Sequence, residues 1–122
     1  MIEEALSRWM DALHALGEPS FVEAAFTQEA VVIRHDWNGE RDPIEVFEGR
    51  ERIGSWLARS PRGVRFTHDP PEREGSSHRV QYTVSLQDFV NQGRWIVLLG
   101  EDGRIARLEH RPDPLPKTQD LP

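Results

Sequence analysis

The chain has 122 residues, no cysteine, and a formal net charge of −6 from 15 Lys and Arg against 21 Asp and Glu. A length close to that of one ordinary domain predicts a single folding unit. The missing cysteines exclude disulfides, a thiolate nucleophile and thiolate-ligated metal sites.

The same composition limits the classes of partner. An acidic chain without a cluster of Lys and Arg does not suit a nucleic-acid backbone, because that binding depends on cation contacts. The sequence has neither an apolar run long enough to span a bilayer nor a signal-peptide pattern, so we expect no membrane partner. We therefore expect a cytoplasmic protein whose partner is a small molecule or another protein.

Helical periodicity marks the N-terminal segment. Apolar residues recur at three- and four-residue spacing over residues 2–16, and Gly17 can adopt the left-handed conformation that ends a helix. Ser20 and Glu23 have the spacing of a capping box. This spacing predicts a short second helix that continues through Phe26.

The next segment changes to strand chemistry. Consecutive β-branched residues predict a strand over residues 30–35, and the turn-forming sequence of residues 36–43 predicts a loop. A short strand is expected at residues 45–48. Beyond Gly49, an apolar face predicts a third helix over residues 50–60.

Apolar and polar residues alternate over most of the remaining chain. This alternation predicts strands over residues 64–68, 78–87, 94–100 and 104–110, with a tight hairpin joining the last two. Residues 94–100 are apolar on both faces and are expected to form a central strand.

This order of elements defines the expected fold class. Helices segregated at one end of an antiparallel sheet make an α+β domain, which we assign to residues 1–111. Residues 112–122 are rich in proline and have few large apolar groups. They are expected to be an extended or disordered tail.

Three local stretches carry a family resemblance. Residues 26–32 (FTQEAVV), 47–53 (FEGRERI) and 101–105 (EDGRI) resemble the SnoaL-like branch of the nuclear transport factor two-like (NTF2-like) superfamily. That superfamily also includes ketosteroid isomerases, polyketide cyclases and scytalone dehydratases. The resemblance implies a curved antiparallel or mixed sheet wrapped around the long N-terminal helix. It further implies a cone shape with an internal apolar cavity, and a homodimer formed through the outer face of the sheet.

The resemblance does not carry the isomerase site with it. The family's oxyanion tyrosine falls at Trp9, its base carboxylate at Arg34 and its second oxyanion acid near Trp95. Because none of these residue types matches, steroid isomerisation by the family's mechanism is not expected. A one-residue slip of the first strand would turn His35 inward in place of Arg34 and Asp36, and both registers are open.

The inward positions implied by the resemblance form an apolar pocket with a few polar groups, as small-molecule sites do. The candidate lining residues are Trp9, Arg34, Phe66, Tyr82, Trp95 and Leu108. An inward Arg34 needs a carboxylate partner, which Glu109 or Asp36 could supply.

His68 and His110 are the candidate acid/base groups, because imidazole titrates near neutral pH. Asp36 is a third candidate, since its carboxylate could orient an imidazole. The alternative interpretation places both histidines at strand ends in solvent and Asp36 in an ordinary turn.

The leading hypothesis is a protein that binds a hydrophobic small molecule and performs cofactor-independent acid/base chemistry. The reaction would be of the cyclase, isomerase or dehydratase kind, with Tyr82 as a hydrogen-bond donor. We expect no metal and no cofactor, because the sequence lacks the usual ligand spacings and phosphate-binding loops. The alternative is a non-catalytic ligand-binding or dimerisation module of the same fold.

Overall fold

The computed structural model describes residues 1–35 and 44–114. These residues form three helices and seven strands, with the following bounds: α1 (Ile2–His14), α2 (Pro19–Ala25), β1 (Phe26–Arg34), β2 (Glu45–Glu48), α3 (Arg50–Ala58), β3 (Arg65–His68), β4 (Glu72–Glu74), β5 (Ser77–Leu86), β6 (Phe89–Leu99) and β7 (Ile105–Pro112).

The strands form one mixed sheet. Its order is β2-β1-β7-β6-β5-β3, with β4 paired to β5, so β6 is a central strand as expected. The β1–β7 pair is parallel and the other pairs are antiparallel. The chain is therefore an α+β domain, as the order of predicted elements indicated.

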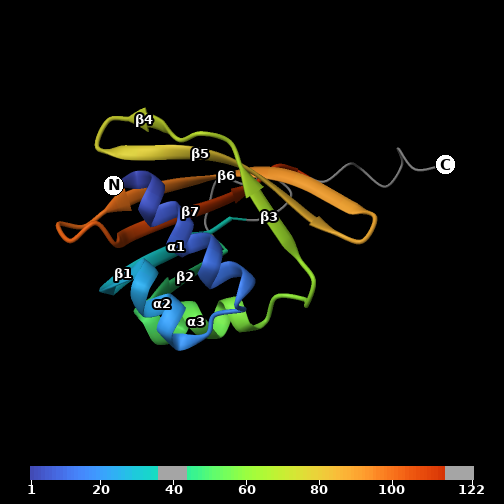
Figure 1. Cartoon of the computed structure of the whole chain (residues 1–122), viewed down its shortest axis with the longest axis horizontal. Helices are drawn as coiled ribbons and strands as arrows, with labels where there is room; N and C mark the ends of the chain where they lie inside the picture. The colour runs from blue at the N-terminus through green and yellow to red at the C-terminus, as the bar shows by residue number, and fades with distance from the viewer. Residues whose placement is uncertain (36–43, 115–122) are drawn as a thin grey trace.

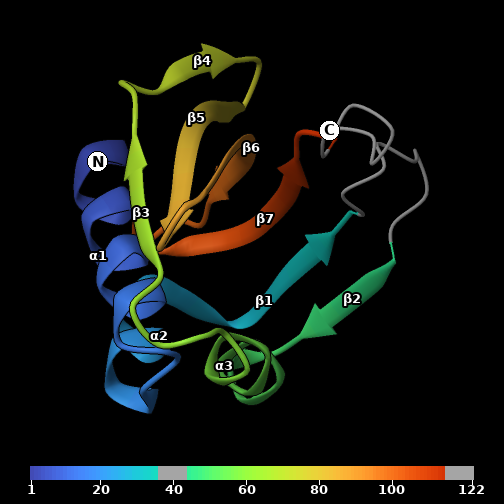
Figure 2. The same ribbon diagram turned by 90° about the vertical axis from the view of Figure 1, so that its right-hand side faces the viewer.

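The helices pack on one face of this sheet. Figure 1 shows α1 crossing in front of the central strands, and Figure 2 shows α3 below β1 and β2. A single buried cluster contains residues of all three helices and of the facing strands. Each of these helices is too short and too polar to cross a membrane, as far as the described residues go.

The turn between α1 and α2 depends on Gly17. This residue has φ +77°, and a Cβ atom there would overlap the carbonyl oxygen of Gly54 in α3. Both the backbone conformation and the close approach of the helices therefore require glycine. Gly17 is left-handed as predicted, but the helix ends earlier, at His14, and Leu16 (φ +54°) is the first left-handed residue after it.

The predicted capping box is wrong. Helix α2 begins at Pro19, and the Glu18 carboxylate accepts a hydrogen bond from the Ser20 backbone N–H at 3.2 Å. Glu18 accepts from the Ser20 N–H, which the Glu23 side chain would have capped in the predicted box. Pro19 has no N–H and suits the first helical position, so the helix begins there. Phe26 belongs to β1 and not to the helix.

Other boundaries also differ from those predicted. β2 is as expected, whereas β6 begins earlier, at Phe89, and β4 was not predicted. β7 ends at Pro112, so the sheet extends one residue into the predicted tail. The predicted loop at residues 36–43 and residues 115–122 lie outside the described residues.

Two neighbouring rows of paired residues cross the same four strands. The apolar row consists of Val97, Leu108, Val32 and Phe47, all of which are buried. The polar row lies two positions along on every strand and consists of Trp95, His110, Arg34 and Glu45. Because side chains alternate across a strand, both rows face the helices.

Candidate functional site

A pocket of about 400 Å³ lies between the polar row and the C-terminal end of α1. Its apolar lining comes from Leu13, Trp56, Leu57, Pro61, Val64, Phe66, Val84, Leu86, Phe89 and Pro112. Its polar lining comes from Arg34, His35, Glu45, Arg59, Ser60, Tyr82 and His110. The apolar groups therefore form most of the wall, and the polar groups are few.

Tyr82 and His110 line the pocket, and the fully buried Trp95 lies behind them and contacts both. The Trp95 Nε1–H donates a hydrogen bond to Nδ1 of His110 at 3.2 Å, and Nε2 of His110 lies 3.2 Å from the Tyr82 hydroxyl oxygen. The Tyr82 ring stacks on Trp95 with 4.6 Å between centroids and on His110 with 5.3 Å. Packing and hydrogen bonding thus hold all three rings.

The surroundings shift the pKa values of two of these groups. Burial lowers the pKa of His110 to about 3, and the nearby charges of Arg34 and His35 act in the same direction. Burial also raises the pKa of Tyr82, with a further contribution from the negative charge of Asp113. At neutral pH the site therefore contains a neutral imidazole and a neutral phenol. His110 does not change charge near neutrality, which was the reason for selecting it.

A second polar group continues the polar row from His110 onto β1 and β2. Arg34 pairs with the Glu45 carboxylate at 3.5 Å. Arg59, the C-terminal cap residue of α3, lies 3.8 Å from the other oxygen of that carboxylate. The predicted partners of Arg34 were Glu109 and Asp36. The described partner is instead Glu45, because β2 pairs with β1 in a register that sets Glu45 opposite Arg34.

The register of the first strand is the unshifted one. Arg34 pairs with His110 across β1 and β7 and lines the pocket. His35 is also buried, with 5% of its surface exposed, and its Nε2 lies 3.0 Å from Glu109. Glu109 follows the alternation of β7 onto the opposite face from His110. Nδ1 of His35 is buried and has no hydrogen-bond partner among the described residues.

Glu109 has two cationic or potentially cationic neighbours. Arg111 donates a hydrogen bond to it at 3.0 Å, in addition to the contact with His35. Burial acts to raise the pKa of Glu109, but the hydrogen bonds from His35 and Arg111 outweigh burial and lower it. Glu109 therefore remains a carboxylate.

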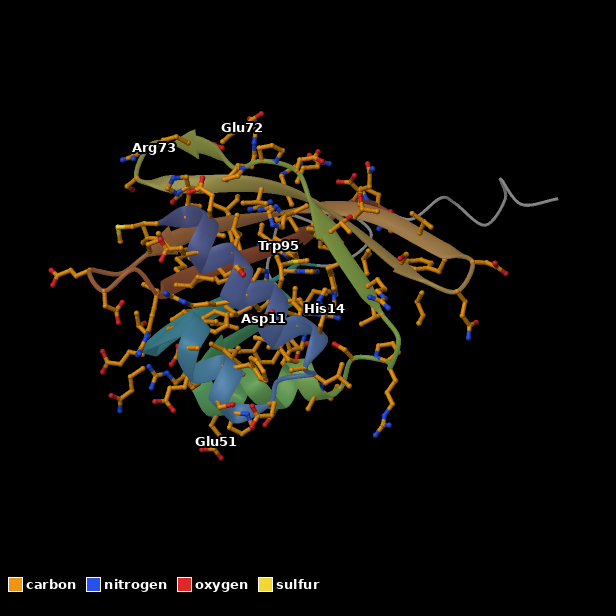
Figure 3. The ribbon with its side chains drawn as sticks, in the orientation of Figure 1. Asp11, His14, Glu51, Glu72, Arg73 and Trp95 are labelled. Carbon is orange, nitrogen blue, oxygen red and sulfur yellow. The ribbon has the colours of Figure 1, made fainter. Side chains whose placement is uncertain are left out.

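The other residues that were predicted to line the pocket lie either at the pocket or in the core. Phe66 lines the pocket, whereas the prediction is wrong for Trp9, Trp95 and Leu108, which are fully buried in the core and do not line it. Trp9 packs edge-on against Phe26 and Trp95, each at 5.6 Å between centroids. In Figure 3, Trp95 lies behind α1, between the helix and the sheet, while Glu72 and Arg73 lie at the outer edge.

His68 is not brought to the pocket. It lies opposite Tyr82 in the β3–β5 register, but its side chain is exposed and its Nδ1 contacts the Asp69 carbonyl oxygen at 2.8 Å. It is absent from the lining. Asp36, the third candidate, lies outside the described residues.

Sequence reasoning placed no residue of β2, of α3 or of the α3 C-terminal cap in the pocket. Glu45 and Arg59 supply charged groups, and Trp56 of α3 supplies an aromatic one. The Trp56 ring stacks on Phe47 at 5.2 Å and meets His110 edge-on at 5.8 Å. A short strand was expected at residues 45–48, but the sequence does not show which strand it pairs with.

No three metal-ligating side chains are grouped within residues 1–35 and 44–114. The donor sets at the pocket are instead the Glu45 carboxylate, flanked by two guanidinium groups, and the Tyr82–His110 pair.

Comparison with known proteins places the fold. No family model and no curated protein matches the sequence. An NTF2-like protein from Burkholderia xenovorans superposes with a TM-score of 0.71 at 16% identity, covering 96% of this chain and 86% of that one. A candidate SnoaL-like polyketide cyclase from a Jannaschia species has a TM-score of 0.70 at 15% identity, covering 90% and 83%.

A candidate isomerase of the SnoaL-like family from Agrobacterium tumefaciens gives a TM-score of 0.67 at 21% identity, covering 91% of this chain and 98% of that one. Likeness at these identities shows the fold and not the activity. The chain therefore has the NTF2-like fold of SnoaL-like proteins, as the three sequence stretches indicated.

Proposed function

We propose that the chain binds an apolar small molecule with an oxygen function in this pocket and performs cofactor-independent acid/base chemistry on it. The observation that carries the proposal is a mainly apolar pocket whose lining includes Tyr82, His110 and Glu45. Two of the structural neighbours are named as a candidate cyclase and a candidate isomerase, which are activities of this chemical kind.

The size and lining of the pocket support ligand binding. Its volume of about 400 Å³ falls in the range of roughly 300–1,000 Å³ common for small-molecule sites. Covering its apolar wall stabilises a bound molecule by roughly 25 cal/mol for each Å² removed from water. The few polar groups then orient the molecule within the pocket.

The polar groups suit proton removal next to a carbonyl. Tyr82 can donate a hydrogen bond to the carbonyl oxygen, where negative charge develops. Glu45 is the only carboxylate among the described lining residues, so it is the candidate base. The carbon–hydrogen bond breaks, its proton moves to the Glu45 carboxylate, and its electron pair forms the enolate. Arg34 and Arg59 hold that carboxylate in place.

Binding is tested by calorimetry with 2-acetylnaphthalene, an apolar ketone. Leu86→Trp fills the pocket, whereas Ser85→Trp places the same side chain on the opposite face of β5. We expect the unmodified chain and Ser85→Trp to bind and Leu86→Trp to lose binding. Equal binding by all three proteins, or binding by none of them, would contradict the proposal.

Catalysis is tested separately by deuterium exchange. The methyl protons of 2-acetylnaphthalene exchange with D2O through the enolate, and proton NMR follows their loss. We expect the protein to accelerate this exchange, and Glu45→Gln to abolish the acceleration while keeping calorimetric binding. Acceleration that survives in Glu45→Gln would exclude Glu45 as the base.

A second candidate function is ligand binding without catalysis. It is favoured by His110, whose two ring nitrogens are both engaged and whose pKa lies near 3. This function predicts calorimetric binding with no accelerated exchange in the unmodified protein.

The proposal includes a homodimer formed through the outer face of the sheet. Ile96 and Leu98 are partly exposed on the β6 face that points away from the helices, which supports this interface. Sedimentation is expected to show a dimer at micromolar concentration that Ile96→Glu dissociates. A monomer before the substitution would contradict the dimer.

A further inference from the structure

Trp95 determines which nitrogen of His110 carries the hydrogen. An indole Nε1–H can only donate, so Nδ1 of His110, at 3.2 Å, must present its lone pair. In a neutral imidazole the hydrogen then lies on Nε2. A hydrogen on Nδ1 would point at the indole N–H, so Trp95 opposes both the other tautomer and the imidazolium ion.

The position of this hydrogen determines the role of the Tyr82 hydroxyl. Nε2–H of His110 donates to the Tyr82 oxygen across 3.2 Å, so that oxygen acts as the acceptor. The hydroxyl hydrogen must then find a different acceptor. Among the described residues, His110 is the only recorded hydrogen-bond partner of the Tyr82 side chain. The Tyr82 residue is 1% exposed, so bulk water does not readily replace that acceptor.

Gly93 leaves room for the Tyr82 ring against the neighbouring strand. It pairs with Tyr82 across β5 and β6, and a Cβ atom on it would lie 2.5 Å from the Tyr82 hydroxyl and 2.7 Å from the Arg111 carbonyl oxygen. The missing side chain lets the phenol lie directly over the strand. The ring therefore lies against Gly93 and is fixed by its stacking on Trp95 and His110.

We propose that Trp95 and His110 together fix Tyr82 as a hydrogen-bond donor, which makes the pocket selective for ligands with an acceptor oxygen. The ligand class is an apolar molecule with a carbonyl or anionic oxygen, in preference to one of the same shape without an acceptor. Tyr82 contacts the ligand, and His110 is a positioning residue that acts through it. This inference rests on the proposed function, because it assumes that the ligand occupies the pocket.

The tautomer is tested without any ligand. NMR of protein labelled with nitrogen-15 in its histidines distinguishes a protonated ring nitrogen from one with a free lone pair. We expect His110 to show a lone pair on Nδ1 and a hydrogen on Nε2 from pH 5 to pH 8. Trp95→Phe keeps an aromatic ring under Tyr82 but removes the donor, and this variant is expected to lose the single tautomer. A hydrogen on Nδ1 in the unmodified protein would overturn the proposal.

Selectivity is tested with a matched pair of probes. 2-Acetylnaphthalene and 2-isopropylnaphthalene have similar shapes, but only the ketone has an acceptor oxygen. We expect the ketone to bind about 2- to 10-fold more tightly, the value of one hydrogen bond, and Tyr82→Phe to remove this preference. Equal binding of both probes by the unmodified protein would overturn the selectivity while leaving the proposed function intact. If neither probe binds, the proposed function fails and the selectivity with it, whereas the NMR result on the tautomer still stands.

The positioning role of His110 is tested by conservative replacement. A Gln amide can accept from Trp95 and donate to Tyr82, whereas Leu can do neither. We expect His110→Gln to retain part of the preference for the ketone and His110→Leu to lose it. The same preference in both variants would show that His110 acts only by packing.

Discussion

The apolar row and the polar row of the sheet share the same four strands and face the same helices, yet they differ in what covers them. The apolar row lies wholly in the buried core, and Trp9 of α1 packs against the polar row only at its β6 end, on Trp95. Three residues of the polar row, His110, Arg34 and Glu45, line the pocket. Leu13, near the C-terminal end of α1, is the only described residue of that helix in the lining. The comparison shows that two neighbouring rows on one face of the sheet are divided between the core and the pocket.

The largest expected effect is the loss of folding stability when a side chain of the apolar row is truncated. Leu108→Ala removes a fully buried side chain and leaves a cavity, so we expect a loss of about 2–5 kcal/mol in the free energy of unfolding. Urea denaturation measures this loss, and the folded fraction should still bind 2-acetylnaphthalene. A loss well under 1 kcal/mol would show that the apolar row is not the main source of stability.

Gly93→Ala tests the close contact beside the polar row. The new methyl group would meet both the Tyr82 hydroxyl and the Arg111 carbonyl oxygen. We expect a destabilisation of about 1–3 kcal/mol from overpacking, measured by urea denaturation. Gly100→Ala, whose nearest contact is a Thr27 methyl group at 3.0 Å, is the milder control.

His110 gives the polar row a dependence on pH. Its pKa is about 3 in the folded protein and about 6.5 when unfolded, so the unfolded chain binds its proton first as pH falls. The contribution of His110 to the free energy of unfolding is fully present above about pH 6.5 and is lost as the pH falls towards 3. The free energy of unfolding decreases by up to about 1.4 kcal/mol per pH unit in this range. Thermal unfolding at several pH values should show this slope, and His110→Gln should remove its contribution.

The smallest effect is expected at the charged groups of the pocket. Arg34 and Glu45 are partly exposed, and ion pairs of that kind contribute less than about 1 kcal/mol. Arg34→Gln should therefore leave the urea midpoint almost unchanged. A loss above about 3 kcal/mol would indicate a buried charge pair, and the two rows would then contribute comparably to stability.

Local patterns were enough to predict much of the fold. The apolar stripe of α1 and the alternation over β5 predicted elements and inward faces that the structure confirms. β4 was missed because its sequence, Glu72–Glu74, has no apolar residue to mark a buried face. The capping box failed because Pro19 and Glu18 supplied a competing start to α2.

The candidate site was less predictable because it depends on contacts between distant segments. Glu45 becomes the partner of Arg34 only through the pairing of β2 with β1. The low pKa of His110 arises from burial, which one sequence does not reveal. His68 had the residue type of an acid/base group, but its place near the end of an edge strand leaves it exposed.

The central claim is that a small apolar molecule binds at the polar row and not within the apolar core. The two fully buried tryptophans report on this directly, since the Trp95 indole N–H bonds to His110 and the Trp9 indole N–H has no hydrogen-bond partner in the described residues. Titration with 2-acetylnaphthalene, followed by proton–nitrogen NMR of both indoles, should shift the Trp95 signal much more than the Trp9 signal. Equal shifts of both signals, or no shift of either, would contradict the account.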